Sequence, residues 1–302
     1  MPISKQPAFL KTGDKVALLA PAKTAAPEAV RSAMETIRTW GLVVQEAPHL
    51  FRPWHQFGAT DDQRRQDLQG ALDAADIRAI ICVRGGYGSS RIVDGLKWEA
   101  FAQNPKWLVG FSDITVLHHA LIRQGYQSIH ATMPLLFDEP GAKPAVEKLR
   151  AVLFGESQDM EVAQQPLNRF GKVTGPLIGG NLSMICHQIG SATEVDMQDA
   201  LLFIEEVGEY YYSMDRMLVQ LDRAGKLAQL KSIIAGSFTE MKDQEKPFGE
   251  SPEEIISRFA AKYDLPLALG FPFGHQALNL PVIQGAVATL EVTTEGTSLR
   301  YQ

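Results

Sequence analysis

The first half of this 302-residue chain alternates strand-like and helix-like segments. KVALLAPA (15–22) and IRAIICV (77–83) are short apolar runs of strand length. Apolar residues at helical spacing follow Pro27, and the sequence TDDQ from Thr60 has the spacing of a capping box. Parallel strands need long crossover connections, so this alternation predicts an α/β fold whose N-terminal domain is a parallel sheet with flanking helices.

The second half of the chain has a different pattern of segments. Residues 156–172 are polar and irregular, which is typical of a linker. The strand-like run LLFIEEVGE (201–209) and a hairpin pattern around Glu295 predict a smaller C-terminal α/β domain rich in strands. Two domains are also expected at this length. We therefore expect domains at residues 1–155 and 173–302, joined by that linker.

Composition argues against several functional classes. The net charge is −6 and no basic run occurs, which argues against a nucleic-acid partner. No stretch approaches the ~18 apolar residues of a membrane span, and the N-terminus lacks a signal-peptide core. Cys82 and Cys186 lie in apolar runs, which indicates buried thiols in a cytoplasmic protein. Neither H-E-x-x-H nor C-x-x-C occurs, so we expect no catalytic metal and no cofactor.

Ser112 stands at a corner between an apolar strand (106–109) and an apolar-periodic helix. A serine here can cap the helix, and the local pattern alone favours that interpretation. The same tight turn can instead expose the hydroxyl as a nucleophile, with the N–H of Asp113 directed at a developing oxyanion. A serine nucleophile also requires a base.

Two of the seven histidines are candidate bases. His275 lies in LGFPFGHQALNLP, a loop rich in glycine and proline where no helical pattern requires a histidine. A local role in that loop remains equally open. His130, in SIHATMP, ends a strand near the same sheet edge and is the second candidate. His118 and His119 lie inside the helix after Ser112, so we expect them to pack or to face solvent.

A histidine base needs an acid that orients it. The strand LLFIEEVGE ends in Glu205 and Glu206, and buried strands rarely end in adjacent carboxylates without a partner. Alternation along a strand points the two side chains to opposite faces, so only one can meet His275. Glu205 directly follows the apolar run and is favoured. Alternatively, both carboxylates are solvated where the strand ends.

Two further segments bear on binding. The loop RGGYGSSR (84–91) lacks the lysine of a P-loop, so nucleotide binding is poorly supported. Its Gly85 and Gly86 allow close backbone approach, as a second oxyanion N–H requires, although a plain tight turn also fits. Asn181 in IGGNLS is either a helix N-cap or a substrate contact, and the cap is favoured. His187, in the apolar run that follows, is expected in the core.

Five ordered motifs resemble those of the LD-carboxypeptidases, serine peptidases that include the muramoyltetrapeptide carboxypeptidases. They are RGGYGSSR, GFSDIT, GGNLS, FIEEVGE with YYSMDRML, and FGHQALNLP. The stretch GATDDQRRQDLQGAL also fits. The resemblance covers nearly the whole chain, and five motifs in order are far more specific than any one of them.

This resemblance implies a triad in which Ser112 is the nucleophile, His275 the base and Glu205 the acid. It places the serine on the N-terminal domain, the other two on the C-terminal domain, and the oxyanion donors on the N–H groups of Gly86 and Asp113. The implied reaction hydrolyses an L,D amide bond and releases the terminal D-alanine of a murein tetrapeptide during peptidoglycan recycling. A homodimer is also implied.

The chain departs from the family pattern at two places. The first strand ends APAKTA (20–25), where the family tends to have small hydroxyl residues after the proline, and HATMP (130–134) replaces the more usual His-Gly-Pro. Neither departure touches the triad, but both bear on substrate fit. The substrate carboxylate needs a cation or an N–H cluster, for which Arg84 is the nearest candidate in sequence. A structural ion pair is the alternative for Arg84.

Three other functions compete with this one. Relatives that resemble microcin C immunity peptidases cleave aminoacyl-nucleotide conjugates, but they usually carry a longer chain with an added loop. A glutaminase-like amidotransferase would use Cys82, which lies inside a strand rather than on an elbow. A non-catalytic small-molecule binder would not need Ser112, Glu205 and His275 together.

Overall fold

A parallel sheet forms the first of two lobes in the computed structural model, which describes residues 4–302. Its strand order is β11-β5-β4-β3-β1-β2. The strands are β1 (Lys15–Leu19), β2 (Val43–Glu46), β3 (Ile77–Cys82), β4 (Trp107–Gly110), β5 (Ser128–His130) and β11 (Val282–Gln284). β1 to β5 are parallel, and β11 pairs antiparallel with β5. The order 2-1-3-4-5 is that of doubly wound folds, whose ligands bind beyond the carboxyl ends of the strands.

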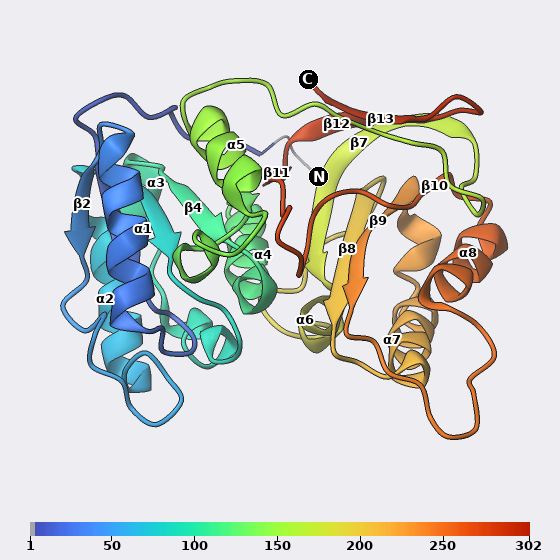
Figure 1. The fold of residues 1–302 in the computed structure, drawn as a ribbon, viewed down its shortest axis with the longest axis horizontal. Helices are drawn as coiled ribbons and strands as arrows, with labels where there is room; N and C mark the ends of the chain where they lie inside the picture. Colours follow the sequence, from blue (N-terminus) through green and yellow to red (C-terminus); the bar gives the residue numbers. More distant parts are fainter. Residues whose placement is uncertain (1–3) are drawn as a thin grey trace.

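Helices cover both faces of this sheet (Figure 1). They are α1 (Pro27–Thr39), α2 (Asp61–Asp73), α3 (Glu99–Gln103), α4 (Thr115–Arg123) and α5 (Lys143–Leu153). Along β1, Val16 and Leu18 pack in the core with α1 and α5, whereas Ala17 and Leu19 pack in the core with α2, α3 and α4. The capping box at Thr60 is present as expected. The expected α/β class is therefore confirmed.

The second lobe is built on a seven-stranded sheet of order β10-β9-β8-β7-β12-β13-β6. Its strands are β6 (Met160–Val162), β7 (Gly171–Asn181), β8 (Leu201–Val207), β9 (Ser232–Thr239), β10 (Leu267–Ala268), β12 (Val287–Val292) and β13 (Thr297–Tyr301), and its helices are α6 (Leu182–His187), α7 (Tyr211–Arg223) and α8 (Pro252–Lys262). β7 to β10 are parallel, and β12, β13 and β6 extend the sheet antiparallel. Short 3₁₀ turns occur at Ser89–Arg91, Val93–Gly95, Ser112–Ile114, Pro134–Leu136 and Leu227–Gln229.

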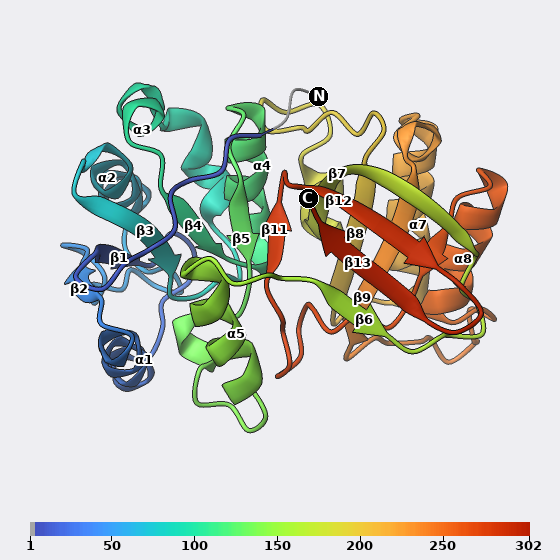
Figure 2. The ribbon, with the colours of Figure 1, turned by 90° about the horizontal axis from the view of Figure 1, so that it is seen from above.

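Two strands occupy positions that the sequence did not suggest. β6 lies within the expected linker at residues 156–172 but pairs with β13 at the edge of the second sheet. β11 comes from the C-terminal half of the chain but pairs with β5 of the first sheet, so it lies between the lobes (Figure 2). Each of these strands is only three residues long, so it carries little periodic signal of its own. The division into residues 1–155, 156–172 and 173–302 stays a prediction.

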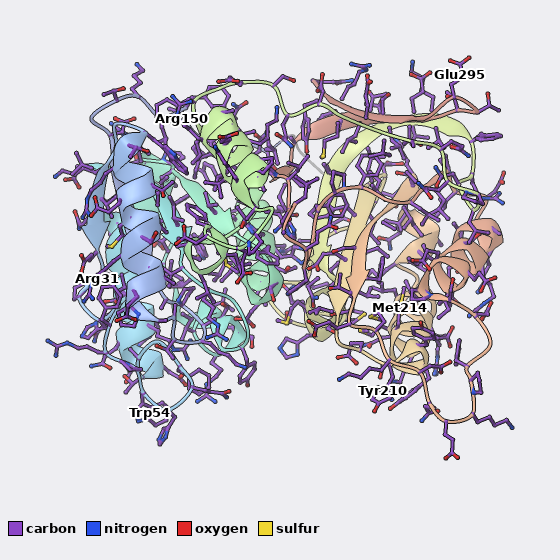
Figure 3. The ribbon with its side chains drawn as sticks, in the orientation of Figure 1. Arg31, Trp54, Arg150, Tyr210, Met214 and Glu295 are labelled. Atoms are coloured by element: carbon purple, nitrogen blue, oxygen red, sulfur yellow. The ribbon has the colours of Figure 1, made fainter. Side chains whose placement is uncertain are left out.

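The helices of the second lobe are amphipathic. Met214 on α7 is fully buried, whereas Tyr210, directly before α7, is 40% exposed (Figure 3). The capping box that begins at Ser251 caps α8 as expected.

Among residues 4–302, no helix combines the length and the apolar character that crossing a bilayer requires. Cys82 and Cys186 are buried and unpaired as expected, and burial raises the pKa of the Cys186 thiol to about 12.

A buried lysine fixes the strand that leads to Ser112. Lys106 lies directly before β4 and is fully buried. Its Nζ donates to the carbonyl oxygens of Ala71, Leu72 and Ala74, at 3.1, 2.9 and 2.5 Å. These oxygens are at the C-terminal end of α2, where a helix leaves carbonyls without partners. Burial lowers the pKa of Lys106 to about 8.

The two lobes meet where the end of β7 packs against α4. The backbone N–H of Asn181 donates to Thr115 Oγ1 at 3.2 Å, and the carbonyl of Gly179 accepts from His119 Nε2 at 3.1 Å. A Cβ added to Gly180 would lie 2.5 Å from Thr115 Oγ1. Only glycine therefore allows the β7 backbone to approach the Thr115 side chain this closely.

Gly179 provides a direct test of this close packing. A Cβ added at Gly179 would lie 1.8 Å from the carbonyl oxygen of Phe203, and the glycine has a φ of +159°. We expect Gly179→Ala to lower the free energy of unfolding by roughly 3 kcal/mol or more, because the backbone of β8 cannot move aside. Urea unfolding followed by circular dichroism measures the change.

Gly70→Ala is the matched control. Gly70 is exposed on α2, and nothing lies within 4 Å of its added Cβ. We expect this variant to gain about 0.5–1 kcal/mol, because alanine loses less backbone entropy in a helix than glycine does. Equal stability of the two variants would contradict the packing of β7 against β8.

Candidate active site

Ser112 occupies a strained corner between β4 and α4. Its φ is +64°, in the left-handed region that residues with a side chain rarely adopt. A Cβ added to the preceding Gly110 would lie 2.9 Å from the Ile114 side chain, so the turn needs glycine there. The Ser112 side chain caps no helix, and its Oγ instead lies 3.1 Å from Nε2 of His275. The interpretation of Ser112 as a helix cap is therefore wrong.

The second lobe supplies the partners of Ser112. His275 Nδ1 lies 2.6 Å from Oε2 of Glu205, the fully buried carboxylate near the end of β8. Because a carboxylate can only accept, Nδ1 carries the proton and Nε2 is left free to accept from the Ser112 hydroxyl. Burial by itself would lower the pKa of His275, but the negative charge of Glu205 outweighs it, so the pKa lies above its usual value.

The neighbouring carboxylate of Glu206 makes a different set of hydrogen bonds. Glu206 points to the opposite face of β8, where its oxygens accept from Asn181 Nδ2 and from the backbone N–H groups of Ser183 and Val207, at 2.8, 2.8 and 2.9 Å. Burial raises the pKa of Glu206. Strand alternation therefore separates the two carboxylates as expected, and only Glu205 meets His275.

Two backbone N–H groups near Ser112 are free. Within residues 4–302, neither Gly86 N–H nor Asp113 N–H donates to another group of the protein. Gly86 is exposed. A Cβ added to Gly85 would lie 3.1 Å from Ser112 Cβ and 3.4 Å from Asp113 N, so the glycine loop lies directly against the serine corner. Two free donors beside a nucleophile are what an oxyanion requires.

The Asp113 side chain holds the glycine loop in place. Its Oδ2 accepts from the backbone N–H of Ser89 at 2.8 Å, and the side chain is almost fully buried. Burial raises the pKa of Asp113, and the hydrogen bond from Ser89 partly counteracts that effect. The carboxylate thus ties the loop that carries Gly86 to the corner that carries Ser112.

Sequence reasoning missed Arg64, which is 1% exposed. Its guanidinium donates to the carbonyls of Pro21, Ala59 and Gly88, and it pairs with Asp61. These carbonyls belong to three loops at the carboxyl edge of the first sheet. A signal was available, because Arg64 precedes Leu68, Ala71 and Leu72 at the spacing of the buried face of α2.

The other expected site residues have structural partners. Arg84 Nη1 donates to the carbonyl of Thr24 at 2.7 Å, which is a backbone contact rather than the ion pair considered as its alternative. Asn181 Oδ1 accepts from Met184 N at 3.2 Å and caps α6, as the favoured alternative requires. Its Nδ2 donates to Glu206, so both ends of the side chain have partners inside the protein.

The other histidines discussed above have environments different from that of His275. His130 is fully buried, and its ring packs against Phe111 and Phe203 rather than against Ser112, so its candidacy as the base is wrong. His118 and His119 are buried, and burial lowers the pKa of each to about 4. His187 is exposed, contrary to the expectation of a core position. Its place at the last residue of α6 turns it to solvent.

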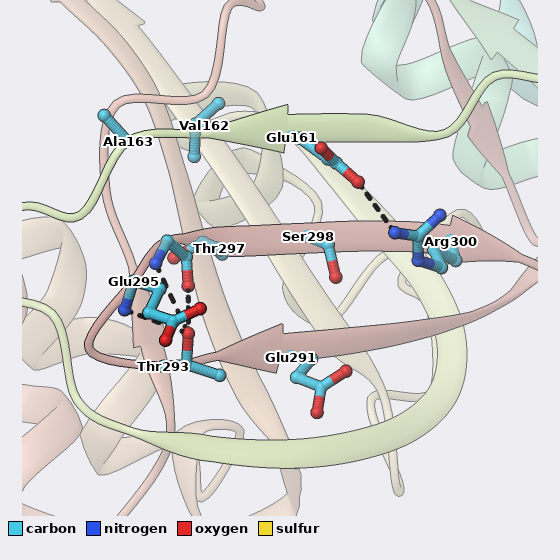
Figure 4. Close-up of a pocket in the computed structure, with 10 residues that line it drawn as sticks. Glu161, Val162, Ala163, Glu291, Thr293, Glu295, Thr297, Ser298 and Arg300 are labelled. Atoms are coloured by element: carbon cyan, nitrogen blue, oxygen red, sulfur yellow. Dashed lines mark hydrogen bonds and ion pairs between the residues drawn. The ribbon is translucent and has the colours of Figure 1, made fainter.

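A hollow of about 570 Å³ lies on another part of the second lobe. It is formed by β6 and the β12–β13 hairpin, where Arg300 pairs with Glu161 and the turn is closed by Thr293 (Figure 4). None of its lining residues belongs to the serine corner or its partners. Among residues 4–302, no group of three or more His, Cys, Asp or Glu side chains is arranged to hold a metal ion.

Both lobes resemble domains of a known peptidase family. Residues 16–131 match the N-terminal domain of the LD-carboxypeptidases, and residues 174–290 match their C-terminal domain. A putative carboxypeptidase of Synechocystis sp. is 33% identical over 95% of this chain and 94% of its own. The murein tetrapeptide carboxypeptidase of Pseudomonas aeruginosa is 32% identical over 95% of each chain.

Solved structures share the fold. The muramoyltetrapeptide carboxypeptidase from Oxalobacter formigenes superposes with a TM-score of 0.86 at 26% identity, over 95% of this chain and 98% of that one. The microcin C7 self immunity protein superposes with a TM-score of 0.87 at 18% identity, over 98% of both chains, which shows the fold alone. With both domain matches and relatives above 30% identity along almost its whole length, this chain belongs to the LD-carboxypeptidase family of serine-type peptidases.

Proposed function

We propose that this protein is a serine carboxypeptidase that hydrolyses the L,D amide bond of murein tetrapeptides and releases D-alanine, with Ser112 as nucleophile, His275 as base and Glu205 as acid. The observation that carries the proposal is the continuous hydrogen-bonded relay from Ser112 Oγ through the His275 ring to Glu205. The names of the relatives from Pseudomonas aeruginosa and Oxalobacter formigenes support a murein peptide as substrate.

The relay supplies a nucleophile at neutral pH. His275 Nε2 accepts the Ser112 proton as Oγ attacks the scissile carbonyl. The imidazolium that forms is stabilised by the Glu205 carboxylate at Nδ1, which also holds the ring in the required tautomer. The negative oxygen of the tetrahedral intermediate accepts from the N–H groups of Gly86 and Asp113.

The same histidine completes the reaction. Protonated His275 donates from Nε2 to the departing nitrogen, so D-alanine leaves and the peptide remains as an ester on Ser112. Water, deprotonated by the now neutral His275, attacks this ester, and the second tetrahedral intermediate uses the same two N–H groups. The collapse of that intermediate returns the proton to Ser112.

Cellular context completes the proposal. A murein tetrapeptide is a recycled fragment, so the protein acts in the bacterial cytoplasm, and the homodimer implied by the family resemblance belongs to the same proposal.

The likeness to the microcin C7 immunity protein rests on 18% identity and supports no nucleotide-conjugate activity here. The buried thiol of Cys82, with its raised pKa, argues against an amidotransferase.

The first test follows D-alanine release from a murein tetrapeptide. We expect release by the wild-type protein and a loss of about 10⁴- to 10⁶-fold in kcat for Ser112→Ala, because the nucleophile is removed. A coupled D-amino acid oxidase assay gives the rates.

Two variants act as controls in this assay. Ser298→Ala changes a serine on the far hairpin and should retain the wild-type rate. Cys82→Ala should retain most of the activity, because that thiol is buried in β3. Equal rates for the wild type and Ser112→Ala would mean that Ser112 is not the nucleophile, and inactivity of Cys82→Ala alone would favour the amidotransferase.

A second prediction concerns pH. Neutral His275 is the active form, and its pKa is raised, so kcat/KM should fall as the pH drops through a value above the ordinary 6.5 of histidine. Glu205→Gln removes the charge that raises this pKa, so the acidic limb should move to lower pH while kcat falls about 10³- to 10⁴-fold.

The pH profile of kcat/KM for both proteins measures these effects. Glu253→Gln, which changes an exposed carboxylate on α8, should leave the limb in place. A limb that stays unchanged in Glu205→Gln would contradict the assignment of Glu205 as the partner of His275.

A further inference from the structure

One lysine lies directly beside the glycine loop of the site. The side-chain stem of Lys23 runs over Gly86, and a Cβ added to Gly86 would lie 2.6 Å from Lys23 Cδ and 3.3 Å from Cε. The Lys23 ammonium is one bond beyond Cε, and the side chain is half exposed. A flexible cation is thus packed against one of the two free N–H donors beside Ser112.

The backbone around Lys23 is firmly held. Lys23 N donates to the carbonyl of Gly85 at 3.2 Å, and the carbonyl of Ala22 accepts from Gly58 N at 3.0 Å. On the other side, Arg84 Nη1 donates to the carbonyl of Thr24 at 2.7 Å. These contacts fix the base of the Lys23 side chain against the loop, so its stem is positioned while its ammonium keeps some freedom.

The other cationic side chains near Lys23 already have partners inside the protein. Arg64 is buried on three backbone carbonyls, Arg91 pairs with Asp61, and Arg84 holds Thr24. Within residues 4–302, the Lys23 ammonium has neither an ion pair nor a hydrogen bond to the protein. An unpaired cation beside Gly86 is available to a ligand anion.

The proposed substrate brings such an anion to this place. The α-carboxylate of a terminal D-alanine is two bonds from the scissile nitrogen. When the scissile carbonyl oxygen occupies the position beside Gly86 N–H and Asp113 N–H, the carboxylate must lie close to the same loop. An ammonium on a four-carbon stem can reach over that distance and follow the leaving group.

We propose that Lys23 is the residue that binds the terminal carboxylate of the substrate and thereby selects peptides with a free C-terminus. The proposal rests on the proposed function and deepens it. It replaces the sequence-based expectation that Arg84 binds this carboxylate. Arg84 instead acts as a positioning residue, because it holds the segment that carries Lys23.

The test measures binding, so that it does not depend on turnover. The Ser112→Ala protein is titrated by calorimetry with a synthetic murein tetrapeptide as the free acid and as the C-terminal amide. We expect the acid to bind about 10- to 100-fold more tightly, as one charge-assisted contact allows. With Lys23→Met added, the preference should fall below about threefold, and with Lys23→Arg it should largely return.

Lys11→Met is the control, because Lys11 is an exposed lysine on the N-terminal segment. It should leave the preference for the acid unchanged. A preference that survives Lys23→Met, or no preference in the Ser112→Ala protein, would overturn the proposal. An equal loss of kcat/KM on acid and amide substrates in Lys23→Met would also overturn it, because that pattern reports on the oxyanion loop rather than on the carboxylate.

The outcome separates this proposal from the proposed function. If the wild type releases D-alanine and the preference does not depend on Lys23, the function stands and the role of Lys23 fails. If the wild type releases no D-alanine but binding of the acid depends on Lys23, the carboxylate site stands and the proposed reaction fails.

Discussion

The contact between α4 and β7 is the constraint on which the rest of the site depends. Ser112 lies in the short 3₁₀ turn directly before α4, and Glu205 lies on β8, the neighbour of β7. Hydrogen bonds between Thr115 and Asn181, and between His119 and Gly179, hold the two lobes at this point. A relay that spans two lobes tolerates errors of only about 0.5 Å, so the β7 backbone has to lie directly against the side chains of α4. The two consecutive glycines of β7 allow this contact.

Strain and close packing are concentrated at the serine corner. Ser112 keeps a left-handed φ of +64°, and such a conformation persists only where the surroundings enforce it. Gly110 before it and Gly85 beside it remove the side chains that would block the turn. Asp113 then fastens the glycine loop through Ser89. The Ser112 hydroxyl and the two free N–H groups are positioned by one packed arrangement, rather than by three separate features.

The electrostatics of the site follow from the same packing. Glu205 and Glu206 are adjacent and both buried, yet β-strand alternation gives one to His275 and the other to the start of α6. The buried charge of Glu205 is acceptable because it has a partner that becomes a cation during the reaction. Arg64, in contrast, uses its charge to bind backbone carbonyls of three loops. One cation therefore shapes the site, and Lys23 is left to meet the substrate.

The sequence by itself determined the α/β class, both capping boxes, the buried cysteines and the shortlist of Ser112, Glu205 and His275, because these depend on local periodicity, turn chemistry and ordered motifs. Only the tertiary structure decided between a helix cap and a relay for Ser112, and between His275 and His130 as its partner. Each of these choices depends on which side chains meet across the two lobes. The edge strands β6 and β11 and the buried face around Arg64 also escaped sequence reasoning. Polar residues that are buried by distant partners carry no apolar signal of their own.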